Sequence, residues 1–394
     1  MPNRRSRGRG NRNRIKIVDN ELLNTLIIAL IVIIIIAIAV FVTLNIFQEK
    51  KVAYEKERVE KQQLEIFEST NEELRSLDNY KSNSLIRISA VGDILCGKNL
   101  QEYGKPYNKI FEGISKKLKN TDFTIGTYET DVMNEKQEFA QAVKEAGINY
   151  VSLAHNHALD YGQDGLDETE SYLNEIGMQT VGKNAENAEE RVKIIEKKGA
   201  KIALLAYTYD NNKEGVNIFS EELAKEDLEY ANQNANISIV MMHWGEVNSN
   251  EVSSKQEEQA NFLVENGADI IIGAHPSVVQ KMEVVKNKEG KDCFIGYSLG
   301  DFTSEFENEN ANLELILNLQ IFVDTEGNAS IYKVDYTPVY MIDYGKENAE
   351  NRFKILDMKS EIANFETNKS TITQEIYDKL IRGLERLNSI IIKE

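Results

Sequence analysis

The chain has 394 residues, 41% of them apolar and 28% charged, which is the composition of a globular protein rather than a disordered one. Its net charge is −18; residues 1–24 hold seven cations and two acids, so the rest of the chain has a net charge of −23. So acidic a body lacks the basic surface that nucleic-acid binding needs, which excludes nucleic acid as a partner. It also disfavours broad docking of another polyanion, unless a bound metal ion reverses the charge locally.

Residues 25–47 form a run of 23 residues without any charged side chain, long enough to span a bilayer with some tilt. The length of the run and the cations before it disfavour a buried core helix. A cleaved signal peptide is disfavoured because no small-residue cleavage site follows. The cationic flank places the N-terminus in the cytoplasm and the remainder outside. We therefore predict a cytoplasmic basic tail (1–24) and a single-pass signal anchor (25–47) in the cell membrane.

Residues 48–84 are almost all polar and contain neither proline nor glycine, which predicts a helical stalk. Val52, Val59 and Ile66 recur every seven residues, but three repeats are too few for a coiled coil, so a dimerising helix stays the alternative. The two cysteines, Cys96 and Cys293, lie in a part predicted to be extracytoplasmic, where a disulfide is permitted. The sequence leaves open whether they pair.

From residue 85 onward, short β-type runs alternate with helical stretches, which predicts an α/β domain at 85–345. Strands are predicted at residues 86–91, 122–127, 150–153, 237–242, 269–272, 294–298, 313–322 and 329–334. The strand-rich end suggests a second sheet. One helix is predicted at 164–175, with Asp164 as a possible cap, and another begins after residue 259. A third is predicted at 373–391, within a C-terminal helical segment at 346–394.

Chemically versatile side chains follow the ends of the predicted strands. All four histidines of the chain do so, as do Asp93 and Glu129; the histidines are His155, His157, His243 and His275. In α/β sheets, ligands bind outside the carboxyl ends of the strands, so these residues are expected to share one rim. Asp93 alone would more often be a turn residue, but histidine is the commonest transition-metal ligand. Together the set predicts a metal site.

Several short motifs stand in a fixed order along residues 85–340. They are Val91-Gly92-Asp93, Thr127-Tyr128-Glu129, HNHALDYG (155–162), His243-Trp244-Gly245, GAHPSVVQ (273–280) and YSLGDF (297–302). On these motifs the chain resembles the CapA capsule-synthesis (poly-γ-glutamate) branch of the calcineurin-like metallophosphoesterases. The resemblance implies a calcineurin-like two-sheet α/β sandwich.

The resemblance also implies two adjacent metal positions. Glu129 would bridge them, Asn156, His243 and His275 would complete one position, and Asp93 would serve the other. Mixed nitrogen and oxygen ligands suit a divalent ion such as Mn, Zn or Fe. Two metals can generate a hydroxide nucleophile and stabilise the developing oxyanion.

The family pattern further implies that His157 acts as proton donor or charge stabiliser, oriented by Asp160. Three departures from the pattern affect the second metal position or its surroundings. Leu95 and Ser277 stand where phosphoesterases have histidines, and Asp301 stands where the family has asparagine. Both missing histidines belong to the Asp93 position, so one tight ion and a weak second one are expected; the sequence does not place Asp301.

The resemblance implies a membrane-anchored extracytoplasmic protein of capsule or poly-γ-glutamate biosynthesis, acting as a divalent-metal-dependent hydrolase. Its expected partners are the membrane, an anionic polymer and, in one interpretation, membrane synthase subunits. The alternative is a catalytically weak accessory subunit that binds polymer in the same cleft or docks on a synthesis complex. A phosphoesterase acting on cell-wall or nucleotide phosphate esters is a third hypothesis.

Overall fold

The computed structural model describes residues 20–60, 65–68, 85–133, 136–209, 215–304 and 311–391. The chain divides into two compact units, Met1–Gln62 and Gln63–Glu394, and each is described by itself.

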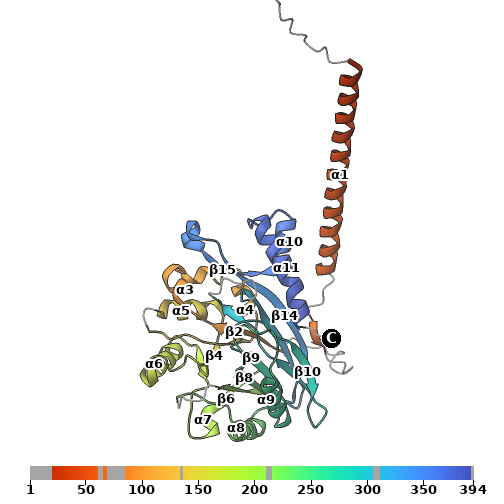
Figure 1. The fold of residues 1–394 in the computed structure, drawn as a ribbon. Helices are drawn as coiled ribbons and strands as arrows, with labels where there is room; N and C mark the ends of the chain where they lie inside the picture. Colours follow the sequence, from red (N-terminus) through yellow and green to blue (C-terminus); the bar gives the residue numbers. More distant parts are fainter. Residues whose placement is uncertain are drawn as a thin grey trace, which may run out of the picture. The chain divides into compact units, whose positions relative to one another are not determined.

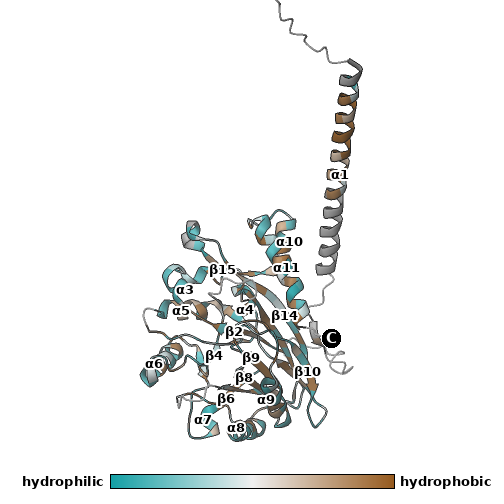
Figure 2. Cartoon of the chain, in the orientation of Figure 1, coloured by the Kyte–Doolittle hydropathy of each residue, from teal (hydrophilic) through white to brown (hydrophobic). Residues whose placement is uncertain are grey.

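The described part of the first unit is one long helix, α1 (Asn20–Glu60). Its segment Asn24–Leu44 is apolar, fully exposed, and long enough to cross a membrane; Figure 2 shows this stretch as the brown part of α1. The prediction of an apolar N-terminal helix is confirmed. The helix continues to Glu60, but β1 (Glu65–Glu68) is a strand where the sequence predicted a helical stalk over 48–84. The strand forms because it pairs antiparallel with β14, a tertiary contact that local polarity does not reveal; residues 61–64 and 69–84 lie outside the described part.

The second unit contains two sheets (Figure 1). The first sheet runs β1-β14-β13-β2-β3-β4-β5, with β12 beside β2 and β15 beside β14; the second runs β10-β11-β9-β8-β7-β6. Strands β2 to β5 are mutually parallel, as are β7, β8, β9 and β11. The strands of the first sheet are β2 (Leu85–Ile94), β3 (Phe123–Thr127), β4 (Tyr150–Ser152), β5 (Gln179–Val181), β12 (Asp301–Thr303), β13 (Leu313–Val323), β14 (Ala329–Asp343) and β15 (Phe353–Asp357). Those of the second are β6 (Lys193–Lys197), β7 (Ala200–Thr208), β8 (Ile237–His243), β9 (Ile270–Ala274), β10 (Met282–Lys286) and β11 (Asp292–Gly296).

Helices cover the sheets. They are α3 (Lys98–Tyr103), α4 (Ser115–Lys119), α5 (Gln137–Ala146), α6 (Gly162–Glu175), α7 (Ala188–Arg191), α8 (Glu221–Asn234), α9 (Ser254–Glu265), α10 (Met358–Glu366) and α11 (Gln374–Ile391), with 3-10 turns η2 (Tyr107–Lys109) and η3 (Lys346–Asn351). Helices α8 and α9 bury their apolar faces against β7, β8 and β9. Because β8 and β9 are buried along their whole length, each reads as a continuous apolar run, typical of parallel strands covered on both faces.

The predicted two-sheet α/β architecture is confirmed, and every predicted strand has a counterpart. Besides β1, several strands were not predicted: β5, β6, β7, β10, β12 and β15. Of these, β7 is almost wholly buried. Strand β15 lies inside the segment expected to be helical after residue 345. It forms a strand because its apolar residues are buried as it pairs antiparallel with β14. Helix α6 begins at Gly162, with Asp164 in its first turn rather than at its cap. Cys96 and Cys293 are both buried, and they do not form a disulfide with each other.

Strand β2 and the loop before β12 approach each other too closely for any side chain at Gly92. A Cβ atom on Gly92 would overlap the carbonyl oxygen of Gly300, and the Asp93 N–H donates to that same oxygen at 3.2 Å. Glycine at position 92 therefore lets two distant segments meet next to Asp93.

We expect Gly92→Ala to lower the free energy of unfolding by about 2–3 kcal/mol, because the added methyl group must push the two segments apart. The matched control is Gly290→Ala, in a turn with φ of 81° and open space around it, which should cost about 1–2 kcal/mol for the left-handed backbone alone. Urea unfolding of the full chain in detergent, followed by fluorescence of the single tryptophan Trp244, measures both. Equal costs for the two variants would contradict the close approach.

Candidate metal centre

Three ionisable side chains from the two sheets meet at the carboxyl ends of their strands. Asp93 lies near the end of β2 and Glu129 two residues after β3, whereas His243 ends β8 in the other sheet. The Nε2 atom of His243 lies 3.5 Å from Asp93 Oδ1 and 3.6 Å from Glu129 Oε2. One ligand atom from each residue lies within 4.8 Å of the other two, which is compact enough to surround a metal ion. The structure thus brings together three residues that the sequence singled out.

The cluster is buried, so its charges act on one another strongly. The side chains of Asp93, His243 and Glu129 are 0%, 1% and 8% exposed. Burial alone would lower the pKa of His243, but the carboxylates of Asp93 and Glu129 outweigh it and raise that pKa to about 10. Burial raises the pKa of Glu129, and the Asp93 charge raises it further. A proton on His243 therefore balances part of the negative charge, in the place that a cation would take.

His275 touches this cluster through its backbone and its ring. Its N–H donates to Asp93 Oδ2 at 2.7 Å, and its ring centroid lies 4.7 Å from that of His243. Its Nε2 atom, however, is 2.8 Å from the hydroxyl of Tyr209, the residue directly after β7. The φ angle of His275 is 97°, a strained value for a residue other than glycine. Tyr209 was missed because β7 was not predicted; the rule that sites follow strand ends would have found it.

The turn after β4 carries the remaining predicted residues. His155 is buried, with its ring centroid 6.1 Å from that of His243, and Asn156 is half-buried beside it. His157 is exposed, and its Nδ1 atom lies 2.7 Å from Asp160 Oδ2. Its charge reaches Glu129, whose pKa it lowers slightly against the larger opposing effects of burial and Asp93. The expected contact between His157 and Asp160 is therefore present at the edge of the cluster.

Asp301 enters the same region on β12, which the sequence did not predict. It pairs in register with Asp93 of β2, is 1% exposed, and neither of its carboxylate oxygens has a hydrogen bond of ordinary length. Burial raises the pKa of Asp301 well above its usual range, and the charges of Asp93 and Glu129 raise it further, against smaller opposing effects of Ser277 and His243. A buried carboxyl group in this state calls for a partner.

At Leu95, one of the two positions without the expected histidine, the backbone is held by the side chain of Thr303. The N–H of Leu95 donates to Thr303 Oγ1, and that hydroxyl in turn donates to the carbonyl of Leu95, both at 2.8 Å. These bonds tie β12 to β2 just beyond Asp93 and Asp301. Glu314 of β13 is fully buried behind them, and burial together with the charge of Asp301 raises its pKa well above the usual range.

One buried amide holds the loop after β8 against the loop after β9. The Nε2 of Gln280 donates to the carbonyl oxygens of Ser249 and Glu251, each at 3.0 Å. Its Oε1 accepts from Gln256 Nε2 at 2.8 Å. Gln280 is fully buried, so these bonds fix the backbone that follows both histidine-bearing strands.

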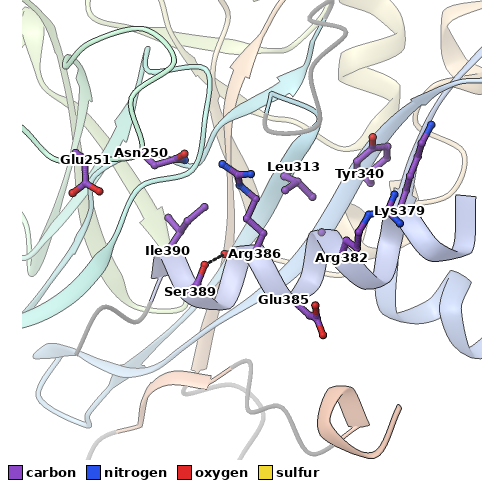
Figure 3. Close-up of a pocket in the computed structure, with 11 residues that line it drawn as sticks. Asn250, Glu251, Leu313, Tyr340, Lys379, Arg382, Glu385, Arg386, Ser389 and Ile390 are labelled. Carbon is purple, nitrogen blue, oxygen red and sulfur yellow. Dashed lines mark hydrogen bonds between the residues drawn. The ribbon is translucent and has the colours of Figure 1, made fainter. Parts of the chain in front are cut away.

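A cavity of about 670 Å³ lies along α11, apart from this centre. Figure 3 shows Arg386 and Lys379 rising from α11 on the side of Leu313 and Tyr340. Its lining mixes cations with Glu251 and Glu385 and includes none of the clustered carboxylates or histidines described above. The cavity is therefore not a continuation of the candidate centre.

Comparison with known proteins places the chain in a family. The sequence model described as "Bacterial capsule synthesis protein PGA_cap" matches residues 87–305, more than half of the chain. The chain is 31% identical over 257 residues to "Capsule biosynthesis protein CapA" of Bacillus anthracis, covering 57% of this chain and 61% of that one. It is 27% identical over 247 residues to "PGA biosynthesis protein CapA" of Bacillus subtilis (strain 168), covering 56% and 64%. The chain belongs to the bacterial capsule synthesis protein family, and it spans less than two thirds of either relative.

Solved structures give weaker similarities. A Staphylococcus aureus protein assigned as a 5'-nucleotidase matches with a TM-score of 0.45 and 15% identity, over 77% of this chain and 58% of that one. A purple acid phosphatase from yellow lupin matches with a TM-score of 0.34 and 10% identity, over 64% and 53%.

We expect Gln280→Ala to lower the free energy of unfolding by about 2–4 kcal/mol, because two backbone carbonyl groups and the buried Gln256 amide lose their partner. Gln141→Ala is the matched control: the side chain of this exposed glutamine on α5 donates to Glu145 at the surface, and its loss should change stability by no more than about 0.5 kcal/mol. Trp244 fluorescence in urea measures both. A cost for Gln280→Ala as small as that of the control would contradict the role of this amide in holding the loops.

Proposed function

We propose that this protein acts outside the cytoplasm in making, releasing or anchoring an anionic capsule polymer such as poly-γ-glutamate, as a divalent-metal-dependent hydrolase. Family membership supports the capsule role, and the names of both Bacillus relatives refer to capsule or PGA biosynthesis. The observation that carries the hydrolase proposal is the buried cluster of Asp93, Glu129 and His243 at the carboxyl ends of strands from both sheets.

The cluster has the donors and the uncompensated charge that a divalent ion requires. Asp93 Oδ1 and both ring nitrogens of His243 are buried without a hydrogen-bond partner among the residues described. Asp93, Glu129 and His243 would hold the ion, and Asn156 and His275 are the additional ligands that the family pattern implies. His275 can ligate through Nε2 only if Tyr209 gives up its hydrogen bond. Carboxylate and imidazole ligands suit Mn, Zn or Fe.

When bound, such an ion supplies a polarised water and a positive charge beside the scissile bond. The side chains of this chain supply the rest. Asp160 accepts a hydrogen bond from Nδ1 of His157, which fixes the tautomer and leaves Nε2 exposed to exchange a proton with a leaving group. In so acidic a body, a cation at the centre also offsets the repulsion that an anionic polymer would otherwise meet.

A catalytically weak accessory subunit is the second candidate. Leu95 and Ser277 stand at the two positions where phosphoesterases have histidines, and Tyr209 engages the Nε2 atom of His275. Such a subunit would bind the polymer at the same place, or contact membrane synthase subunits, without turning polymer over.

The two candidates are separated by assaying the full chain in detergent, loaded with Mn²⁺, Zn²⁺ or Fe²⁺. Its substrates are poly-γ-glutamate, a γ-glutamyl amide and an aryl phosphodiester. Metal-dependent cleavage of the polymer or the amide supports the hydrolase. Binding of poly-γ-glutamate without cleavage of any substrate overturns the hydrolase and supports the accessory subunit.

We expect His243→Ala to weaken divalent-ion binding at least about 10- to 100-fold, since even groups behind the ligands contribute that much. His155→Ala is the matched control, because this histidine is equally buried but contributes no ligand atom to the Asp93, Glu129 and His243 cluster. Titration of the metal-free full chain, with bound ion measured by mass spectrometry, gives both affinities. Equal loss in the two variants would show that the ligands are assigned wrongly.

Protease added to intact cells is expected to digest the chain beyond about residue 48, since seven cations precede the apolar helix and favour a cytoplasmic N-terminus. An N-terminal tag should survive in a short protected fragment, while a C-terminal tag is lost. Protection of the C-terminal tag in unbroken cells, with its loss after lysis, would reverse the orientation and the extracytoplasmic localisation.

A further inference from the structure

We propose that Asp301 is a ligand of a second divalent ion, held between Asp93 and Asp301 beside the first, and that this second position is built from oxygen ligands alone. The inference rests on the proposed metal centre and extends it. It replaces the expectation that the second ion has only Asp93 and a shared Glu129.

The placement of Asp301 follows from strand pairing. Asp301 and Asp93 are register partners in the parallel pair β12 and β2, so their backbones are neighbours at the ends of adjacent strands. The Asp93 N–H bonds the carbonyl of Gly300, and the Leu95 and Thr303 bonds continue the tie beyond the pair. The position of Asp301 is therefore fixed by the backbone on both sides.

The state of the Asp301 side chain indicates that a ligand is missing from it. Asp301 is only 1% exposed, and both carboxylate oxygens lack a hydrogen bond of ordinary length. Its register pairing with Asp93 and the bond from the Asp93 N–H to the carbonyl of Gly300 place it beside the centre. A carboxylate confined in this way is costly to bury unless it is paired or coordinates a cation.

Asp301 lies outside the tight cluster of Asp93, Glu129 and His243, which favours a neighbouring ion over an additional ligand for the same one. Ser277 lies close enough to act on Asp301, and Ser277 and Leu95 are the two positions at which histidine ligands are missing. Asp301 is thus near both positions at which the histidines are missing.

The oxygen ligands of the second position determine which metal ion it prefers. Two carboxylates with water are ligands that Mg²⁺ and Mn²⁺ accept, whereas zinc sites usually use at least one nitrogen or sulfur ligand. The centre is therefore expected to hold one ion at the position with His243 and a hard ion at the position with Asp301.

The test uses Mn²⁺ and the full chain in detergent. Two Mn²⁺ ions per chain, with an electron paramagnetic resonance spectrum showing magnetic coupling between them, are expected for the wild type. Asp301→Asn, which restores the family residue, should bind one Mn²⁺ with an uncoupled spectrum. Glu314→Gln is the control: it alters a carboxyl group buried behind Asp301 and should retain the coupled pair.

Thermal unfolding provides a second measurement. In Asp301→Asn the metal-free chain should unfold at a higher temperature than the wild type, because a carboxyl group that is costly to bury beside other acids has been replaced by a neutral amide. Mn²⁺ should raise that temperature by less. A purely structural role for Asp301 would instead lower it with and without the ion, and that result overturns the proposal.

The outcomes separate this inference from the proposed function. A wild-type chain with one Mn²⁺ and no coupling overturns the Asp301 assignment alone. A wild-type chain that binds no divalent ion overturns the metal centre and this inference together.

Discussion

Two carboxylates buried against a single imidazole impose the constraint on which the rest of the site depends. Asp93 and Glu129 lie 3.5 Å and 3.6 Å from the same nitrogen of His243, and the cluster is nearly closed to solvent. Like charges in a dry interior repel strongly unless a proton or a metal ion stands between them. Asp301 and Glu314 add two more buried acids nearby, and burial raises the pKa of each well above its usual range. A fold that keeps these groups together without gaining anything from them would be difficult to account for.

The scaffold meets this constraint by placing Asp93, Glu129 and His243 at or just after the ends of their strands. Parallel strands in both sheets end on the same side, and their polar residues are carried there by apolar runs that stay buried along β8 and β9. Close backbone contacts fix the placement further. Gly92 lies so near the carbonyl oxygen of Gly300, and Gly273 so near that of Tyr297, that a side chain at either glycine would collide. Gln280 then closes the loops behind the two histidine-bearing strands.

The sequence predicted much of this because strand alternation, histidine placement and the family motifs all agree. The two-sheet architecture was predicted from strand alternation and the family resemblance, and the meeting of Asp93, Glu129 and His243 from their places at the ends of strands. The rest depends on contacts between distant segments. Strand β12 is three residues long and pairs with a strand about 200 positions earlier, so nothing local could place Asp301. Strand β1 likewise forms through its pairing with β14. The hydrogen bond between Tyr209 and His275 depends on the place of β7, a continuous apolar run in which polar and apolar residues do not alternate.

The two halves of the centre come from different sheets, with Asp93 and Glu129 on one and His243 on the other. An ion held among them is then a crosslink that joins the sheets at the seam of the domain. The sheets could then not separate without releasing the ion. The free energy needed to separate them would therefore rise with the logarithm of the free-ion concentration. A protein exposed to its surroundings would thus have an interior whose rigidity follows the supply of divalent cations around it.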